Sequence, residues 1–389
     1  MRGGKAAGIR LYRLRAGQWE SIPYQIDARD RDGEYVPAED AEAPDLVVDA
    51  DDELVFMARD SGDRAARAVL APAVEIELRD PLTEDRGWVY VFEFSGLAPP
   101  RSPRRYVSYD AANDEVRAES YEIGYEQRRN FLRSMRIPPT AGGSGKNILQ
   151  RMWMLGRPTF SILAAHWTID ITENTTRSRV VSVTSGPVRV IRRTRLSVDL
   201  GRFLPSLPGG HIYTTHYPSH VVAPMRFSIP RIIIRALRSF EFESLTDFRT
   251  KAAATRYWDG DNPDGLGLGA GVSVATTADH EWWAVGGEAG TYLQALFIPD
   301  SWKEWGIARG AVLRGGGSRG PSAGYSLLNM KNLREGGTYQ LKTAMVILPR
   351  PYRAGDEVAP MAMFRAPLEV AAHRFGNRVV ALRSPSLAP

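Results

Sequence analysis

The sequence predicts an all-β protein built from antiparallel sheets, and three observations support this prediction. Most apolar segments are short and rich in β-branched and aromatic residues, as half-buried strands are. The chain contains 36 Gly and 26 Pro, which separate these segments as turns. No strand pattern alternates with a helix pattern, so a parallel sheet is not expected.

The expected strands are runs bounded by Gly, Pro, Asn or Asp. They cover residues 74–80, 88–94, 180–200, 281–287, 291–299 and 338–349. Helical periodicity is scarce: residues 118–135 fit a strand followed by a short helix, and residues 232–240 fit a helix. The Gly- and Arg-rich segment 314–324 is expected to be an exposed loop.

A Pro-rich stretch, LAPPRSPRR at residues 97–105, indicates a linker. We therefore expect two domains, an amino-terminal β-sandwich module over residues 1–105 and a larger β-supersandwich over residues 106–389. With 389 residues, of which 43% are hydrophobic, the chain is long enough to bury a core in each domain.

Composition excludes several kinds of chemistry. The chain has no cysteine, so disulfides, thiolate metal sites and cysteine nucleophiles are excluded. Residues 1–120 carry 16 basic and 25 acidic side chains, whereas the remainder carries 34 and 20, so the second part could attract a polyanion. Arginine richness is spread along the chain and no nucleic-acid-binding motif occurs, so nucleic acid is not an expected partner.

Hydropathy gives no membrane-spanning segment, because no run of about 18 apolar residues occurs. The first residues, MRGGKAAGIRLYRLR, are basic but have no apolar h-region, so no signal peptide is visible. A chain from which an export signal had been removed would begin in the same way, and this is the interpretation we favour.

An acidic loop follows the first apolar segments. Asp27, Asp30 and Asp32 precede Gly33, and hard oxygens at alternating positions before a glycine are typical of calcium loops. The alternation is incomplete, so the alternative is a turn that the aspartates cap. A second acidic cluster lies at residues 49–53, directly before an apolar strand. Its carboxylates either protect that strand from aggregation or provide further ligands for the same ion.

The loop YWDGDNPDGLGLG, residues 257–269, holds the densest group of hard oxygens. Asp259, Asp261 and Asp264 are candidate calcium ligands, and calcium is the only cofactor that the sequence suggests. A turn between two strands explains the same residues without a metal ion.

Histidine and tyrosine are interleaved in GGHIYTTHYPSH, residues 209–220. On a strand, His211 and Tyr213 would share a face and His216 would lie on the other, so the set converges only if the chain bends. We take His211, Tyr213, His216 and Tyr217 as candidate general bases, with an exposed loop as the alternative. The basic strand nearby offers candidate carboxylate-binding residues, Arg189 and Arg192.

Most tryptophans lie in the second part of the chain. Indole rings stack on sugars, so Trp258, Trp282 and Trp283 are candidate substrate-binding residues, although indoles also fill the cores of sandwiches. Because Trp282 and Trp283 are adjacent on an expected strand, they should point to opposite faces.

Two motifs resemble a known group of proteins. The pair IPYQIDARDRDGEY and DADDELVFMARD is similar to the amino-terminal signature of uncharacterised exported bacterial proteins, in which a Gln-x-Asp strand is followed by an Asp-Glu-Leu-Val-Phe strand. Members are similar to proteins encoded near polyuronate degradation genes. Residues 185–198, 336–356 and 364–370 resemble strands of the galactose-mutarotase-type supersandwich.

The resemblance implies a periplasmic or secreted protein that interacts with carbohydrate, and lyase or hydrolase chemistry on an acidic polysaccharide is the enzymatic form of this hypothesis. The resemblance does not identify any catalytic residue in this sequence. The alternative is a non-catalytic surface or assembly protein that binds a protein partner. A concave cleft lined by residues 211–217 would favour the first hypothesis, and a flat sheet face the second.

Overall fold

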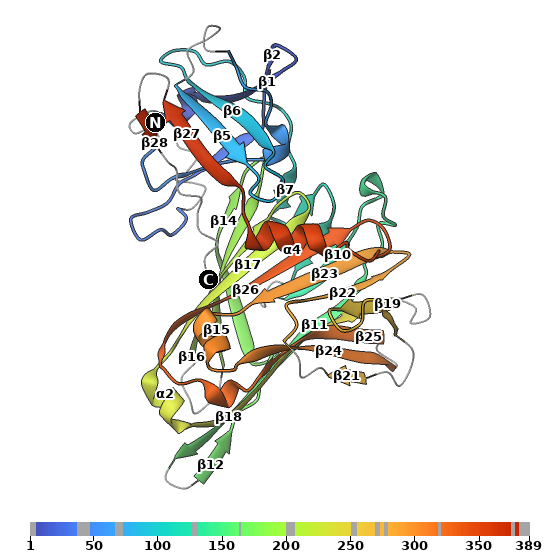
Figure 1. The fold of residues 1–389 in the computed structure, drawn as a ribbon. Coiled ribbons are helices and arrows are strands. Elements are labelled where there is room, and N and C mark those ends of the chain that lie inside the picture. The colour runs from blue at the N-terminus through green and yellow to red at the C-terminus, as the bar shows by residue number, and fades with distance from the viewer. Residues whose placement is uncertain are drawn as a thin grey trace. The chain divides into compact units, whose positions relative to one another are not determined.

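The structure is a computed structural model that describes most of the chain. The described residues are 5–36, 47–66, 73–126, 131–162, 165–199, 207–249, 255–268, 273–275, 279–317, 320–374 and 378–380. The expected all-β class is confirmed, because antiparallel sheets account for most of these residues (Figure 1).

The chain folds into two compact units. Unit 1 consists of residues 1–108, 182–190 and 358–388, and unit 2 of residues 109–181, 191–357 and 389. The predicted linker at 97–105 lies near the end of the first segment. The sequence alone does not indicate the other two segments of unit 1, because the pairing that places them there joins residues that are far apart in the chain.

Unit 1 contains a six-stranded antiparallel sheet. Its order is β2 (Gln18–Ser21), β1 (Ile9–Arg15), β6 (Arg86–Glu93), β5 (Val74–Arg79), β27 (Glu369–Arg374) and β28 (Arg378–Val380). Strand β27 pairs with β5 from Glu369↔Arg79 to Arg374↔Val74, so the carboxy-terminal part of the chain completes this sheet.

A two-stranded ribbon, β3 (Tyr24–Asp27) and β4 (Glu53–Phe56), packs on this sheet. Its apolar side chains, Tyr24, Ile26 and Leu54 among them, join the core that Leu11 and Val89 form on the sheet. Short helices complete the unit: η1 (Ala6–Gly8), η2 (Ala58–Asp60) and α4 (Val358–Arg365).

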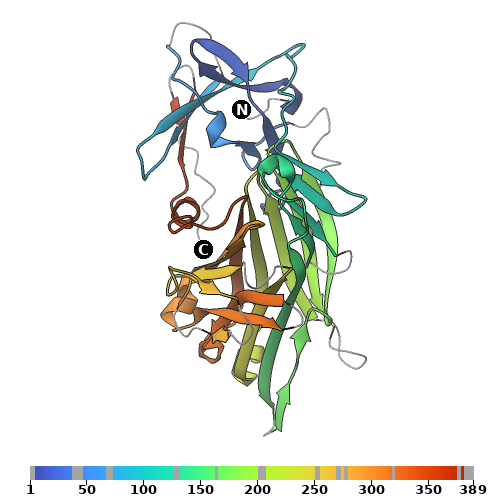
Figure 2. The ribbon, with the colours of Figure 1, turned by 90° about the vertical axis from the view of Figure 1, so that its right-hand side faces the viewer.

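Unit 2 contains two large antiparallel sheets. The seven-stranded sheet has the order β12 (Ala165–Thr168), β11 (Leu149–Ile162), β18 (Leu237–Phe248), β25 (Gly320–Leu328), β24 (Ala308–Gly317) and β21 (Ser273–Ala275), and β13 (Ile171–Thr172) pairs with β11. Figure 2 shows the long green-to-yellow strands of unit 2, which include β11 and β18.

The nine-stranded sheet provides the other face of the core of unit 2. Its order is β14 (Thr176–Ser185), β15 (Val190–Val198), β16 (Leu207–His216), β17 (His220–Ile229), β26 (Gly337–Leu348), β23 (Gly290–Phe297), β22 (Trp282–Gly287), β19 (Arg256–Asp259) and β20 (Leu266–Gly267).

A four-stranded sheet adds to this core. Its order is β10 (Leu132–Arg136), β9 (Glu122–Tyr125), β8 (Glu115–Ala118) and β7 (Val107–Asp110), the last of which crosses the boundary between the units. The helical turns of unit 2 are short: η3 (Pro139–Ala141), α2 (Arg231–Ala236), α3 (Asp300–Glu304) and η5 (Met330–Asn332).

Three local predictions need correction. Residues 118–135 form no helix in their described part, because β8, β9 and β10 hydrogen-bond in sequence. The expected helix at 232–240 is α2, which ends at Ala236 where β18 begins. The segment 314–324 is largely paired in β24 and β25, and Gly324 lies so close to β18 that an added Cβ would be 2.0 Å from the carbonyl oxygen of Ser244.

Candidate functional site

The inner faces of the two large sheets of unit 2 enclose a cavity. Side chains on a strand alternate between faces, so every second residue of β17 and β26 faces the opposing sheet. From the seven-stranded sheet, β18 and β25 contribute in the same way, since Phe242 pairs with Leu327 and Ser244 with Tyr325. The residues that face the cavity from these four strands are Ala223, Met225, Phe227, Ile229, Leu341, Thr343, Met345, Phe240, Phe242, Ser244, Tyr325 and Leu327.

The cavity has a volume of about 380 Å³ and an apolar lining. The space is partly open rather than a closed void in the core. No Asp, Glu, His, Lys or Arg side chain is among the described lining residues. Five lining residues are methionines, whose flexible side chains adapt to ligands of different shape: Met152, Met154, Met225, Met330 and Met345.

Tyr125 lines one part of the cavity and contacts a buried histidine. Its hydroxyl lies 2.8 Å from Nε2 of His216, while Nδ1 of His216 lies 3.3 Å from the hydroxyl of Tyr121. The Tyr121 hydroxyl also lies 2.8 Å from the backbone oxygen of Tyr217, to which it donates. It therefore accepts from Nδ1–H, which leaves Nε2 to accept from Tyr125. Burial lowers the pKa of His216 to about 3, so the imidazole is neutral.

A buried arginine stacks against the same tyrosine. The guanidinium carbon of Arg192 lies 4.1 Å from the centre of the Tyr125 ring, and the group forms two hydrogen bonds to Asp114 at 2.9 and 2.7 Å. Arg192 also donates to the Thr194 hydroxyl over 2.9 Å. Because its charge is paired in this way, Arg192 supports Tyr125 and His216 rather than offering a free cation.

The structure does not bring the predicted bases together. Thr214 lines the cavity and His216 reaches Tyr125 from the same face of β16, whereas His211 and Tyr213 occupy the alternate positions. Tyr213 lies under the Arg193 guanidinium at 5.4 Å. Tyr217 follows the strand and stacks on His220 with ring centres 4.6 Å apart.

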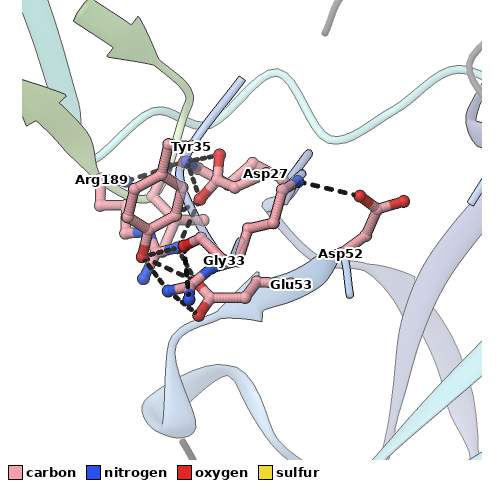
Figure 3. A network of polar contacts seen from close by, with 9 residues as sticks. Asp27, Gly33, Tyr35, Asp52, Glu53 and Arg189 are labelled. Atoms are coloured by element: carbon pink, nitrogen blue, oxygen red, sulfur yellow. Dashed lines mark hydrogen bonds and ion pairs between the residues drawn. The ribbon is translucent and has the colours of Figure 1, made fainter. Parts of the chain in front are cut away.

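Arg189 belongs to a different network, in unit 1 (Figure 3). Its guanidinium contacts Asp27 at 2.7 Å and also pairs with Glu53. Arg29 pairs with Glu53 from the other side, and the Tyr35 hydroxyl donates to Glu53 over 3.0 Å. Two arginines therefore meet two carboxylates, and the formal charges of the network cancel.

The buried position of this network shifts the pKa values of its members. Burial is the largest effect on Asp27 and raises its pKa even though Arg189 opposes the shift. At Glu53 burial acts in the same direction, but the charges of Arg189 and Arg29 together with their hydrogen bonds lower the pKa. Burial also raises the pKa of Tyr35 to about 12. Glu53 is therefore ionised and the Tyr35 hydroxyl is protonated at neutral pH.

The network fixes a turn between two strands. The Gln25 amide oxygen accepts from the backbone N–H groups of Val188 and Arg189 over 3.0 and 2.9 Å, and its nitrogen donates to Asp27. An added Cβ at Gly186 would lie 2.1 Å from the same amide oxygen, so only glycine fits there. The polar residues of the Gln-x-Asp and Asp-Glu-Leu-Val-Phe motifs thus have structural roles in unit 1.

The candidate sugar-binding tryptophans occupy two faces of β19 and β22. Trp283 is fully buried and packs 5.3 Å from Tyr292 in the core. Trp258 and Trp282 lie on the other face, where the Tyr352 ring contacts them at 4.6 and 6.3 Å. Tyr352 therefore packs against both indoles on this face.

The acidic loops are turns in which aspartate oxygens accept hydrogen bonds from the chain. Asp259 Oδ1 accepts from three N–H groups of Asp261 and Asn262 at 2.7–3.0 Å, and Oδ2 accepts from the Tyr257 hydroxyl at 2.8 Å. Asp259 therefore accepts four hydrogen bonds from the loop, three at Oδ1 and one at Oδ2, and these hold the turn. The neighbouring Asp261 contacts His280 at 3.1 Å.

The opening loop is held in the same way. Asp30 Oδ1 accepts from the backbone N–H groups of Asp32 and Glu34, both at 2.9 Å, around Gly33 with its positive φ of 78°. Asp264 and Asp32 are exposed. Across the described ranges, no group of three or more His, Asp or Glu side chains is placed to hold a metal ion. In this structure the loop aspartates are engaged by hydrogen bonds within the turns, and calcium binding stays a prediction.

Sequence reasoning did not find the cavity. Alternating apolar residues on β17, β18 and β26 predict a core, but they do not say how completely the side chains fill it. The five methionines were the available signal, because methionine is frequent at adaptable binding surfaces.

Fold and site together define a two-unit, all-β protein whose larger unit holds an apolar cavity. None of the helices in the described ranges is both long and apolar enough to cross a membrane. No protein-family model matches the chain, and no curated protein matches it. Among solved structures, the chain is similar to the Slr1438 protein from Synechocystis sp. PCC 6803, with 9% identity and a TM-score of 0.35 over 66% of this chain and 100% of that chain. A likeness at this level supports no conclusion about function.

Proposed function

We propose that unit 2 binds an apolar small molecule between its two large sheets. The observation that carries this proposal is the cavity of about 380 Å³, whose described lining is almost entirely aliphatic, aromatic and methionine side chains. This volume falls within the range of about 300–1,000 Å³ that is usual for small-molecule sites.

The chemistry of the lining favours an alkyl chain over a sugar. Each sugar hydroxyl that is buried without a hydrogen bond costs free energy. Besides two tyrosines and Trp302, the lining has few polar side chains: Thr176, Thr214, Ser244, Gln294 and Thr343. The carbohydrate interaction expected from the sequence stays a prediction, and it concerns other surfaces of the protein. The protein partner and the extracytoplasmic location also stay predictions.

The driving force would be the removal of apolar surface from water. Burial contributes about 0.8 kcal/mol per methylene, so an eight-carbon chain would gain roughly 6 kcal/mol before the cost of immobilising it is subtracted. Micromolar affinity for a longer chain is within reach of this driving force.

A competition titration tests the proposal. N-phenyl-1-naphthylamine, an uncharged fluorescent probe, is titrated into the full chain and is then displaced with octan-1-ol. We expect saturable binding of one probe per chain and complete displacement. Fluorescence that rises without saturation, or a probe that octan-1-ol does not displace, would contradict the proposal.

A further inference from the structure

Gln294 is a polar side chain in this apolar lining. It lies on β23, opposite Met345 of β26, and is 9% exposed. The structure gives its side-chain amide no hydrogen bond among the described residues, whereas its backbone oxygen accepts from the Tyr325 hydroxyl over 2.8 Å. The amide can donate two hydrogen bonds and accept two, so its polar capacity faces the cavity unused.

An unpaired buried amide is costly, since burying such a group without a partner loses its hydrogen bonds to water. Leucine would pack at this position without that cost. The amide therefore points to a ligand group that completes its hydrogen bonds when the cavity is filled.

The same region of the lining offers a second small polar group. Ser244 lines the cavity from β18 and pairs in register with Tyr325, whose hydroxyl reaches across to the backbone of Gln294. Ser244 and Gln294 thus approach the cavity from opposite sheets near one residue, Tyr325. The other polar lining groups are threonines on β14, β16 and β26, the hydroxyls of Tyr125 and Tyr325, and the indole N–H of Trp302.

We infer that the ligand is a neutral amphiphile, an alkyl or similarly apolar body with one uncharged hydroxyl or carbonyl group that hydrogen-bonds to Gln294. The inference rests on the proposed function and adds the class of ligand. An ionised carboxylate or phosphate is disfavoured, because no cationic side chain is among the described lining residues to pair with it. A pure hydrocarbon would leave the Gln294 amide unpaired.

Three probes with the same chain length separate these possibilities. Octan-1-ol, octane and octanoate at pH 8 each compete for the fluorescent probe at equal free concentration. We expect octan-1-ol to bind several times more tightly than octane and at least ten times more tightly than octanoate. Octanoate binding as tightly as octan-1-ol, or octane binding equally well, would overturn the inference while leaving the apolar site in place.

The variant Gln294→Leu tests the residue itself. It should remove the preference for octan-1-ol over octane, a change of roughly fivefold, because one net hydrogen bond is lost. The unliganded variant should also melt at a higher temperature than the native chain, since it lacks the unpaired amide. The matched control is Gln340→Leu on β26, whose position alternates with the cavity-facing Leu341. It should leave the preference unchanged.

The outcomes distinguish the two proposals. If Gln294→Leu binds both probes but keeps the native preference, the role of Gln294 is wrong and the apolar site stands. If Gln294→Leu melts at a lower temperature, the amide has a partner in the native core and the inference fails. If none of the three probes binds the native chain, the proposed function fails together with the inference.

Discussion

The Tyr125 hydroxyl lies 2.8 Å from Nε2 of His216, both side chains are buried, and Tyr125 lines the cavity. This contact makes His216 an acceptor inside the core. Protonation would turn Nε2 into a second donor, leave the Tyr125 hydroxyl without its acceptor, and place a charge beside Arg192.

The pH dependence of stability follows from this contact. Since the folded pKa of His216, about 3, lies below its usual value of 6.5, the unfolded chain binds the proton first as the pH falls. The stability from His216 is complete above about pH 6.5 and is lost between pH 6.5 and 3, at up to about 1.4 kcal/mol per pH unit. Burial lowers the pKa of His220 to about 4, so His220 adds to the same loss.

Denaturant unfolding between pH 7 and pH 4.5 checks this prediction. His216→Gln should lower the free energy of unfolding at pH 7. It should also make this free energy depend less steeply on pH, by an amount that corresponds to the uptake of up to one proton on unfolding. The control, His166→Gln, changes an exposed histidine and should keep the native slope. A slope that is the same in both variants would show that His216 is not buried in neutral form.

The network around Arg189 predicts a large effect in unit 1. Removing one partner of a buried ion pair leaves the other charge unpaired and costs about 3–5 kcal/mol. We expect Arg189→Met to raise hydrogen exchange in β3, β4 and residues 186–190, which the network joins. Arg189→Lys keeps the charge but cannot reach both carboxylates with the same geometry, so it should have an intermediate effect.

The control for this prediction is Arg79→Met. Arg79 forms exposed ion pairs with Glu84 and Glu369, and solvent screening leaves such pairs with little effect on stability. If Arg79→Met and Arg189→Met raise exchange equally, the buried network does not stabilise the turn.

Sequence patterns predicted the strands better than their partners. The strand runs at 74–80, 291–299 and 338–349 match β5, β23 and β26 within one or two residues, because alternation and turn residues are local signals. The pairing of β27 with β5 and the contact of Arg189 with Asp27 join residues far apart in the chain, and no local pattern encodes them.

The candidate site shows the same limit. Alternation correctly separates His211 from His216, and it also separates Trp282 from Trp283. Identifying the partners of His216 required the position of Tyr121 and Tyr125 on another sheet. Charge patterns at Asp27 and Asp259 suggested an ion. In the structure the Arg189 and Gln25 side chains donate to Asp27, and backbone N–H groups of its own turn donate to Asp259.

The loop at Asp259 gives a test of the ion hypothesis. Because the protein already donates four hydrogen bonds to Asp259, we expect neither EDTA nor excess calcium to change the melting temperature. Asp259→Ala should cost about 1–3 kcal/mol, since it leaves the buried Tyr257 hydroxyl and several N–H groups unpaired. Asp264→Ala, on the exposed part of the same loop, should have little effect. Calcium-dependent melting would contradict this account of the loop.

Filling the cavity should abolish binding without unfolding the chain. Ala223 faces the cavity from β17, so Ala223→Leu should weaken binding of N-phenyl-1-naphthylamine at least tenfold while leaving the free energy of unfolding within about 1 kcal/mol of the native value. Ser228→Leu, on the exposed face of the same strand, is the control and should bind the probe normally. Equal binding by both variants would locate the probe elsewhere.

The most direct test of the apolar site uses the methionines as reporters. With all methionine methyl groups labelled with carbon-13, octan-1-ol is added while methyl spectra are recorded. The account predicts shifts confined to the lining residues Met152, Met154, Met225, Met330 and Met345, with Met57, Met361 and Met363 of unit 1 unchanged. Shifts in the unit 1 methionines alone, or no shift at saturating octan-1-ol, would contradict it.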